Sequence, residues 1–409
     1  STLPCDKMDG DEFRSRPMPS VFSSWKEYRH LAKQLRKRGK VLQAVPNIST
    51  KLNVPLFLTL STGLFRKALK TTIISMMDVR SDRYAFRIAG ILSRFFNFFL
   101  KADFKMQALP EVFDLWGDGI DLVVFEEFEA GAAALHLKDV VERKDLLDDK
   151  AYRKKVKREW RRKIVPKAFH RDFNHSKIIS CPDLSVVGKS FEEIAKEKKC
   201  DVIDIFLDLI VAHGDQLRWF SVMGNDRPDW LKWIVAHPDI LIGFSDAGAH
   251  LRNMAHYNFP LRLLKMVRDS EQDEVPFMSV SKAVHRLTYE IAEWFDLDAG
   301  LVKVGRRADL VVIDPTHLDQ KLEQIHEVPM PGFTGLNRLV RRNDDAVSAV
   351  LINGKIVFEN GIKASQFGHE QGYGTVLRAG QYHEISLWKK ISYTDHNQVN
   401  SFSNDNITF

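Results

Sequence analysis

Residues 240–250, ILIGFSDAGAH, combine residue types whose spacing suits hydrolytic chemistry. Three apolar residues lead to Asp246, and only alanine and glycine separate this aspartate from His250. A carboxylate at the end of a buried strand can serve as a general base or acid. The alternative is that Asp246 caps the next helix, which would not explain its place at a strand end. We therefore interpret Asp246 as a catalytic residue.

Other polar residues follow Asp246 closely. His250 can donate a hydrogen bond to a developing oxyanion or orient a metal ligand, or it can be a structural histidine of the turn. Arg252 is a candidate for binding a substrate carboxylate, because its planar guanidinium can make two parallel hydrogen bonds. His256 is a weaker candidate.

The bulk composition excludes several classes of protein. The 409 residues are 44% hydrophobic and 28% charged, as in ordinary globular proteins. The net charge of +6 is a mild excess without a nucleic-acid-binding motif, so we expect no nucleic-acid partner. Three cysteines without a CxxC pair argue against a disulfide framework or a structural zinc site.

No apolar run is long enough to span a membrane, and we expect a cytoplasmic protein. The aromatic segment 94–104, RFFNFFLKADF, is interpreted as a buried helix; the alternative is a patch that faces substrate or membrane. The last residues, 381–409, are polar and are expected to form a peripheral tail.

Apolar runs alternate with helical patterns along the first 300 residues. The spacing in 27–40 predicts a helix, and we interpret the apolar runs as strands: 41–45, 56–60, 72–78, 219–223 and 240–246. This alternation predicts a parallel sheet, and catalytic residues at its carboxyl ends are typical of a (β/α) barrel. Residues 79–200 read as a helical insertion with a basic, solvated helix face, and 301–380 as a small β domain.

Two motifs carry a resemblance to a known family. The pair KVGRRADLVVIDP (303–315) and VLINGKIVFENG (350–361) resembles the end of metal-dependent amidohydrolases, and GFSDAGAH resembles their eighth-strand motif. DGIDLVVFEEFEAG, HRDF and FSDAGAHLRNMAHYNF are similar to segments of the D-aminoacylase branch, the N-acyl-D-amino-acid deacylases. The resemblance covers about residues 1–380. It implies an α/β fold: strands five to eight of a (β/α)8 barrel in 1–300, plus part of a small β-sandwich domain.

The resemblance also implies a reaction. In this family the eighth-strand aspartate, here Asp246, contacts a divalent metal, usually zinc, and the attacking water. The metal lowers the pKa of that water enough to supply hydroxide near neutral pH. The implied activity is hydrolysis of the amide bond of N-acyl amino acids, N-acyl-D-amino acids in particular. The alternative is a metal-free relative that binds a ligand or acts as a scaffold.

Departures from the family pattern motivate that alternative. Where D-aminoacylases carry metal-binding histidines on strands five and six, the resemblance places Val45 and Leu60. The family's His-x-His pair and cysteine ligand are absent from the chain. We therefore expect one metal, with Asp246 as a ligand and the others upstream. His170, Asp172 and His175 in HRDFNH are candidate replacement ligands, although such histidines are more often structural.

By the same resemblance, Ser1 lies at the tip of strand four. An open half barrel exposes a sheet edge and its core face, so we expect a partner polypeptide that carries the first half of the barrel. Either the chain is an arbitrary truncation or a precursor is cleaved at this point. Cleavage would place Ser1 on the active-site face as a candidate nucleophile. Whether the complex forms a homo-oligomer is left open.

Overall fold

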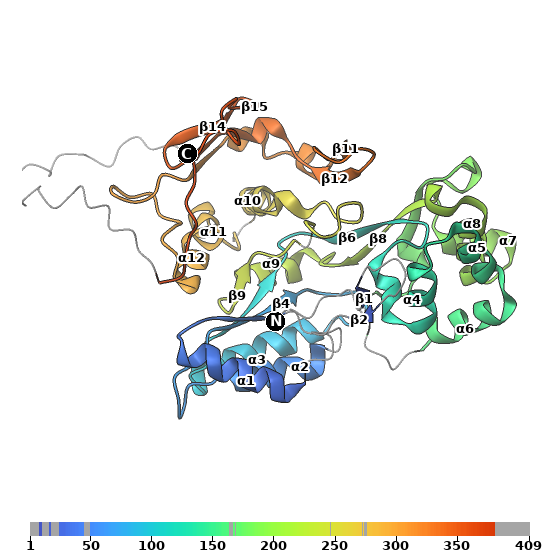
Figure 1. Cartoon of the computed structure of the whole chain (residues 1–409), viewed down its shortest axis with the longest axis horizontal. Helices are drawn as coiled ribbons and strands as arrows, with labels where there is room; N and C mark the ends of the chain where they lie inside the picture. The colour runs from blue at the N-terminus through green and yellow to red at the C-terminus, as the bar shows by residue number, and fades with distance from the viewer. Residues whose placement is uncertain are drawn as a thin grey trace, which may run out of the picture.

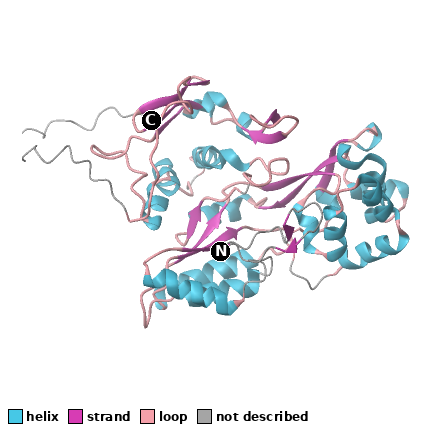
Figure 2. Cartoon of the chain, viewed as in Figure 1, coloured by secondary structure: helices cyan, strands magenta, loops and turns pink. Residues whose placement is uncertain are grey.

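The computed structural model describes residues 8–9, 16–17, 24–44, 50–162, 167, 169–245, 247–271, 273 and 276–380. Figure 1 shows three groups of elements: a helix-covered sheet, a helical lobe at one end, and antiparallel strands along one side. Figure 2 shows the same view coloured by helix and strand. Near the amino terminus β1 (Met8–Asp9) pairs with β2 (Arg16–Pro17).

A four-stranded parallel sheet forms the centre of the molecule. Its strands are hydrogen-bonded in the order β3 (Leu42–Ala44), β4 (Thr71–Met76), β5 (Phe104–Ala108) and β9 (Ile240–Ile242). All three pairings are parallel. The inward residues are almost fully buried, as expected for parallel strands that are covered by helices.

Three helices cover one side of this sheet: α1 (Trp25–Lys37), α2 (Thr50–Ser61) and α3 (Ala85–Phe99) (Figure 1). A capping box formed by Ser24 and Glu27 starts α1, which confirms the helix expected from the spacing in 27–40. Tyr28 of α1 packs edge to face against Phe57 of α2, with ring centroids 5.3 Å apart. Together these contacts build one apolar core between helices and sheet.

The strand expected at 56–60 is wrong, because these residues form the end of α2. LFLTL is apolar on every side, and such a short run fits a buried helix as well as a buried strand. Leu60 is therefore a buried helical residue, and the second parallel strand ends at Met76 instead. Val45 lies outside the described residues.

Most of the segment between β5 and β9 forms a separate lobe, whereas its last helix, α9 (Pro228–Ala236), packs on the parallel sheet. The lobe contains the antiparallel sheet β6 (Phe113–Asp118), β8 (Arg218–Gly224) and β7 (Ser176–Ser180), in that order. Its helices are α4 (Glu129–His136), α5 (Val140–Asp148), α6 (Lys150–Trp160), α7 (Phe191–Lys198) and α8 (Val202–His213). The run 219–223 is thus a strand, but an antiparallel one outside the parallel sheet. The expected insertion range 79–200 contains α3 and β5, so the excursion from the sheet is 109–239.

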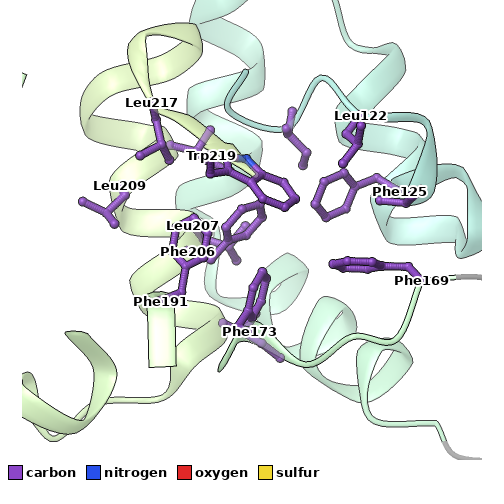
Figure 3. Packing of buried hydrophobic residues seen from close by; sticks show 14 of the residues in the cluster. Leu122, Phe125, Phe169, Phe173, Phe191, Phe206, Leu207, Leu209, Leu217 and Trp219 are labelled. Carbon is purple, nitrogen blue, oxygen red and sulfur yellow. The ribbon is translucent and has the colours of Figure 1, made fainter. Parts of the chain in front are cut away.

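Aromatic side chains fill the core of this lobe. Figure 3 shows Phe125, Phe173, Phe191 and Phe206 gathered around Trp219 of β8. Phe125 and Phe206 stack with centroids 5.5 Å apart, and the indole nitrogen of Trp219 donates to the Gly119 carbonyl at 2.8 Å. The lobe therefore has its own packed core and its own hydrogen-bonded sheet.

After β9 the chain forms α10 (Phe259–Ser270), α11 (Val280–Leu287) and α12 (Tyr289–Phe295). Its remaining strands are antiparallel: a sheet of β10 (Leu310–Ile313), β13 (Val347–Ile352), β14 (Lys355–Glu359) and β15 (Ile362–Lys363), and a hairpin of β11 (Ile325–Pro329) and β12 (Asn337–Arg341). None of the helices in the described ranges combines the length and hydrophobicity that crossing a bilayer requires. The expected tail 381–409 lies outside the described residues.

Candidate functional site

The carboxyl ends of the parallel strands define the candidate site. Their last residues, Ala44, Met76, Ala108 and Ile242, are all apolar and buried. The backbone amide of Gly243 donates to the carbonyl of Ala108 at 3.2 Å, so β9 leaves the sheet beside the end of β5. These strand ends position the loops that follow them but offer no side chain for acid–base chemistry.

Asp246, the proposed catalytic residue, lies outside the described residues, but the turn after it is described. Ala247 is fully buried, whereas a Cβ added to Gly248 would meet nothing within 4 Å. The carbonyl of His250 accepts hydrogen bonds from the amides of Asn253 and Met254, both at 3.0 Å. His250 is half-buried and closes this turn, so the structure places it on the loop that leaves β9.

Arg252 is held by carboxylates of the protein itself. Its Nε donates to Asp118 at 2.8 Å and its Nη1 to Glu327 at 2.7 Å. Hydrogen bonding to Asp118 raises the pKa of Arg252 above its usual value. A substrate carboxylate would have to displace these partners, so Arg252 in this arrangement links the lobe to the β11–β12 hairpin.

A buried ionic cluster joins the end of β5 to the loop after β9. His256 Nδ1 lies 2.8 Å from Glu111 Oε1, and His256 Nε2 lies 3.2 Å from the carbonyl of Asp114. Arg262 of α10 pairs with the second oxygen of Glu111, and Arg341 of β12 pairs with Asp114. Glu111 and His256 are almost fully buried. Both ring nitrogens of His256 therefore face oxygen atoms of the segment that follows β5.

Sequence reasoning gave His256 the least weight and missed Glu111 and Arg262. Recognition of β5 as a strand would have identified Glu111, which follows the end of that strand by three residues. The interpretation of 79–200 as a helical insertion concealed this strand. Burial lowers the pKa of Arg262 to about 10, which leaves its guanidinium charged at neutral pH. The cluster therefore fixes the loop that carries His250 against the strand ends through full charges in a buried setting.

A second buried carboxylate follows β4. Asp78 accepts two hydrogen bonds from Arg227, from Nε at 2.6 Å and from Nη2 at 2.7 Å. The side chain of Asn225 accepts from the amide of Asp78 and donates to the carbonyls of Leu109 and Glu111. This junction ties the ends of β4, β5 and β8 together, and its arginine neutralises the carboxylate.

The proposed replacement ligands do not converge on a metal site. His170 Nδ1 accepts from the amide of Asp172 at 2.9 Å, and His175 lies 3.6 Å from the Asp172 carboxylate. Among the described residues, which include all three, no group of three or more His, Cys, Asp or Glu is arranged to hold a metal ion. Together with the apolar strand ends, this means that the described residues alone do not fit a metal.

His170 also forms a pair with Ser221 that resembles a base and its nucleophile, at 3.0 Å. Burial lowers the pKa of His170 to about 4, so the ring is neutral at physiological pH. Since Nδ1 already accepts a hydrogen bond, the single ring proton lies on Nε2 and donates to Ser221 Oγ. His170 therefore has no lone pair with which to deprotonate Ser221, and the pair is structural.

Comparison with known proteins shows which family one segment matches and which solved structure the fold resembles. A model of the amidohydrolase family matches residues 233–357, which contain β9, the turn at 247–253 and the strands up to β13. Residues 233–357 are therefore a segment of the amidohydrolase family. In its fold the chain resembles the crystal structure of the N-acyl-D-glutamate deacylase from Bordetella bronchiseptica, which contains zinc and a phosphonate inhibitor, with a TM-score of 0.51 at 17% identity. The match covers 89% of this chain and 61% of that one.

Closer relatives in sequence are uncharacterized proteins of Mycobacterium tuberculosis and Mycobacterium bovis. Each is 45% identical over 381 residues, which are 92% of this chain. The chain spans 62% of the length of these relatives.

The buried cluster yields a stability prediction. Glu111→Gln removes the charge that compensates Arg262, so the free energy of unfolding is expected to fall by about 3–5 kcal/mol. The measurement is chemical denaturation followed by tryptophan fluorescence. The matched control is Glu197→Gln, which breaks the surface pair with Lys189 and is expected to cost less than about 1 kcal/mol. Equal losses for the two variants would contradict the role of the cluster.

Proposed function

We propose that this chain, together with a polypeptide that supplies the first half of the barrel, hydrolyses the amide bond of N-acyl amino acids. N-acyl-D-amino acids are the proposed substrates. The observation that carries the proposal is the family match over 233–357, because it encloses β9, Asp246 and the turn that carries His250. The likeness to the Bordetella bronchiseptica deacylase supports it at the level of the fold.

The proposed architecture follows from the sheet. Four parallel strands in the order β3-β4-β5-β9 are what strands five to eight of a (β/α)8 barrel would contribute. Among the described residues β3 and β9 are the edge strands of this sheet, and Arg286 occupies one backbone carbonyl of β9, that of Ile240. A polypeptide with strands one to four would pair with both edges and close the barrel. The antiparallel strands after residue 300 then form part of a small β domain.

In the proposed mechanism Asp246 acts first as a base and then as an acid. Its carboxylate takes a proton from the water that attacks the amide carbonyl and delivers it to the departing nitrogen. His250, on the same turn, donates a hydrogen bond to the oxyanion. The Glu111–His256–Arg262 cluster anchors the chain directly after this turn. The open space at Gly248 leaves room for substrate.

We further propose one divalent ion, zinc by likeness to the Bordetella bronchiseptica structure, which holds zinc. Because the described residues do not fit a metal by themselves, Asp246 is the one ligand that we assign to this chain. The other ligands belong to the partner polypeptide.

A second candidate function has one observation in its favour. Strands β3, β4 and β5 end in Ala44, Met76 and Ala108, and none of these side chains is a usual ligand of a zinc ion in proteins. A metal-free relative that binds a ligand or acts as a scaffold would have this arrangement.

The catalytic assignment is tested with Asp246→Asn. Loss of the general base is expected to lower kcat for N-acyl-D-amino acid hydrolysis by about 10²–10⁴-fold while the thermal unfolding midpoint stays unchanged. Release of the free amino acid measures the rate. Asp215→Asn, which changes an exposed aspartate of the lobe, serves as the matched control and keeps full activity. Near-normal turnover in the Asp246 variant would remove this residue from the mechanism.

Metal content separates the two candidate functions. The purified active protein is expected to hold no more than one tightly bound divalent ion, because Ala44, Met76 and Ala108 cannot bind one. Elemental analysis by mass spectrometry counts the ions. Two stoichiometric ions would contradict this expectation, and none would favour the metal-free function.

Mass spectrometry of the purified active protein tests whether a partner polypeptide is present. The proposal predicts two polypeptides that co-elute under native conditions and separate in denaturant, the second with roughly 150–200 residues. Residues 1–409 expressed alone are expected to aggregate or to bind a hydrophobic dye through the open sheet edges. A single, soluble, active 47.1 kDa monomer would overturn the split barrel.

A further inference from the structure

Helix α3 is apolar on its outer face as well as on its inner one. Five large exposed side chains recur every three or four residues from the residue before α3 to near its end, and a sixth, Phe99, follows the last of them directly: Tyr84, Ile88, Ile91, Phe95, Phe98 and Phe99. Phe98 is 72% exposed and Ile91 64% exposed. The interpretation of 94–104 as a buried helix is therefore wrong for this face. A row of this kind on one helix face marks an interaction surface rather than scattered apolar exposure.

The inner face and one flank of α3 are already packed, so the outer row is not an unfinished core. Phe86 meets Trp230 and Trp233 of α9 edge to face, and Gly90 lies against Trp233. Helix α2 also contacts α3, and Figure 1 shows α1–α3 as one layer. Strands added beside β3 or β9 would extend the sheet at its edges. They would not cover the outer face of α3, because α3 packs on β5, an inner strand of the sheet.

The loop before β4 enlarges this surface. The amide of Gly63 donates to the carbonyl of Leu100 at 3.2 Å, which brings Leu64 and Phe65 next to the end of α3. Phe65 is 98% exposed. We call the outer row of α3 together with Leu64 and Phe65 the α3 patch.

The part of the chain that carries the α3 patch is rich in cations. Residues 24–103 contain sixteen lysines and arginines against four acidic residues, a net charge of +12, twice that of the whole chain. The exposed charged residues of α3 are Arg87 and Arg94, and Lys101 follows the helix. Arg36 donates to the carbonyl of Lys67 at 2.9 Å, which adds the basic end of α1 to the loop beside Phe65.

From this combination we propose that the α3 patch docks on the surface of an anionic lipid bilayer, with α3 lying in the plane of the interface. Aromatic and aliphatic side chains enter the boundary of headgroups and acyl chains while the flanking cations pair with lipid phosphates. This inference is independent of the proposed hydrolase function.

The charge selects the bilayer over other occupants. A second copy placed across a two-fold axis would bring two sets of the same cations together, which opposes association. A single-stranded nucleic acid stacks its bases on aromatic rings, but Leu64, Ile88 and Ile91 offer no ring. Acyl chains accept all eight side chains of the patch.

Docking in this way leaves the candidate site open. The loop with Phe65 leads into β4, and Lys101 precedes β5, so the basic end of the patch lies at the amino ends of the parallel strands. The candidate site lies at their carboxyl ends.

Vesicle flotation of the active material, which contains the full chain with any polypeptide that co-purifies with it, tests the proposal; aggregates without vesicles do not float. Binding is expected with phosphatidylcholine vesicles that contain about 30% phosphatidylglycerol, and at least about tenfold weaker binding without the anionic lipid or in about 0.5 M salt. The triple variant Phe95→Ser, Phe98→Ser, Phe99→Ser is expected to lower the affinity at least about tenfold. Its thermal unfolding should match the wild type, because these side chains are exposed.

Two control variants make the result specific. Phe333→Ser changes an exposed phenylalanine of the β11–β12 hairpin, and Lys154→Glu with Arg158→Glu changes the basic face of α6. Both are expected to bind vesicles like the wild type. Wild-type affinity in the triple variant, or failure of the wild type to bind vesicles, would overturn the proposal. So would a patch-dependent dimer in size-exclusion chromatography, or patch-dependent binding of a single-stranded oligonucleotide without vesicle binding.

Discussion

The parallel pairing of β5 with β9 is the constraint on which the rest of the structure depends. Met106 lies opposite Ile240 and Ala108 opposite Ile242, although residues 109–239 separate the two strands in sequence. Closing so long a loop costs conformational entropy, and the three opposed residue pairs of β5 and β9 cannot offset that cost by themselves. The chain adds buried polar junctions at this point: Asn225 with its three backbone partners, and Glu111 between His256 and Arg262. An error in this pairing would displace every loop of the candidate site.

The sequence was informative where periodicity and composition agreed. The helix at α1 has an amphipathic spacing and a capping box, and the end of β9 was recognised from its apolar run and the small residues after it. The run at 56–60 failed because hydrophobicity on all sides does not distinguish a buried helix from a buried strand. Strand β5 was missed for a different reason. Its alternation includes Lys105 and Gln107, which bond to Glu290 and to Thr72 and so satisfy polar groups inside a sheet.

The candidate site was predictable only in part. Family motifs identified the segment around Asp246 and His250, whereas the buried charges that position it come from residues as distant in sequence as Glu111, Arg262 and Arg341. Such pairings depend on tertiary structure, and nothing in local spacing indicates them. The pair of His170 with Ser221 shows the opposite case, because its residue types suggest catalysis but its geometry does not allow it. The amide of Asp172 donates to Nδ1 of His170, so the ring proton lies on Nε2 and the ring cannot accept a proton from Ser221.

The lobe between β5 and β9 has a consequence for how such a protein changes over generations. Its two ends leave and re-enter the sheet on adjacent hydrogen-bonded strands, and its aromatic core is built within the lobe. Insertions between neighbouring strand ends disturb the host fold least. A lineage can therefore lengthen, shorten or exchange the part of this segment between β6 and β8 as a module, while Glu111, Asn225 and α9, which anchor the segment to the sheet, stay in place.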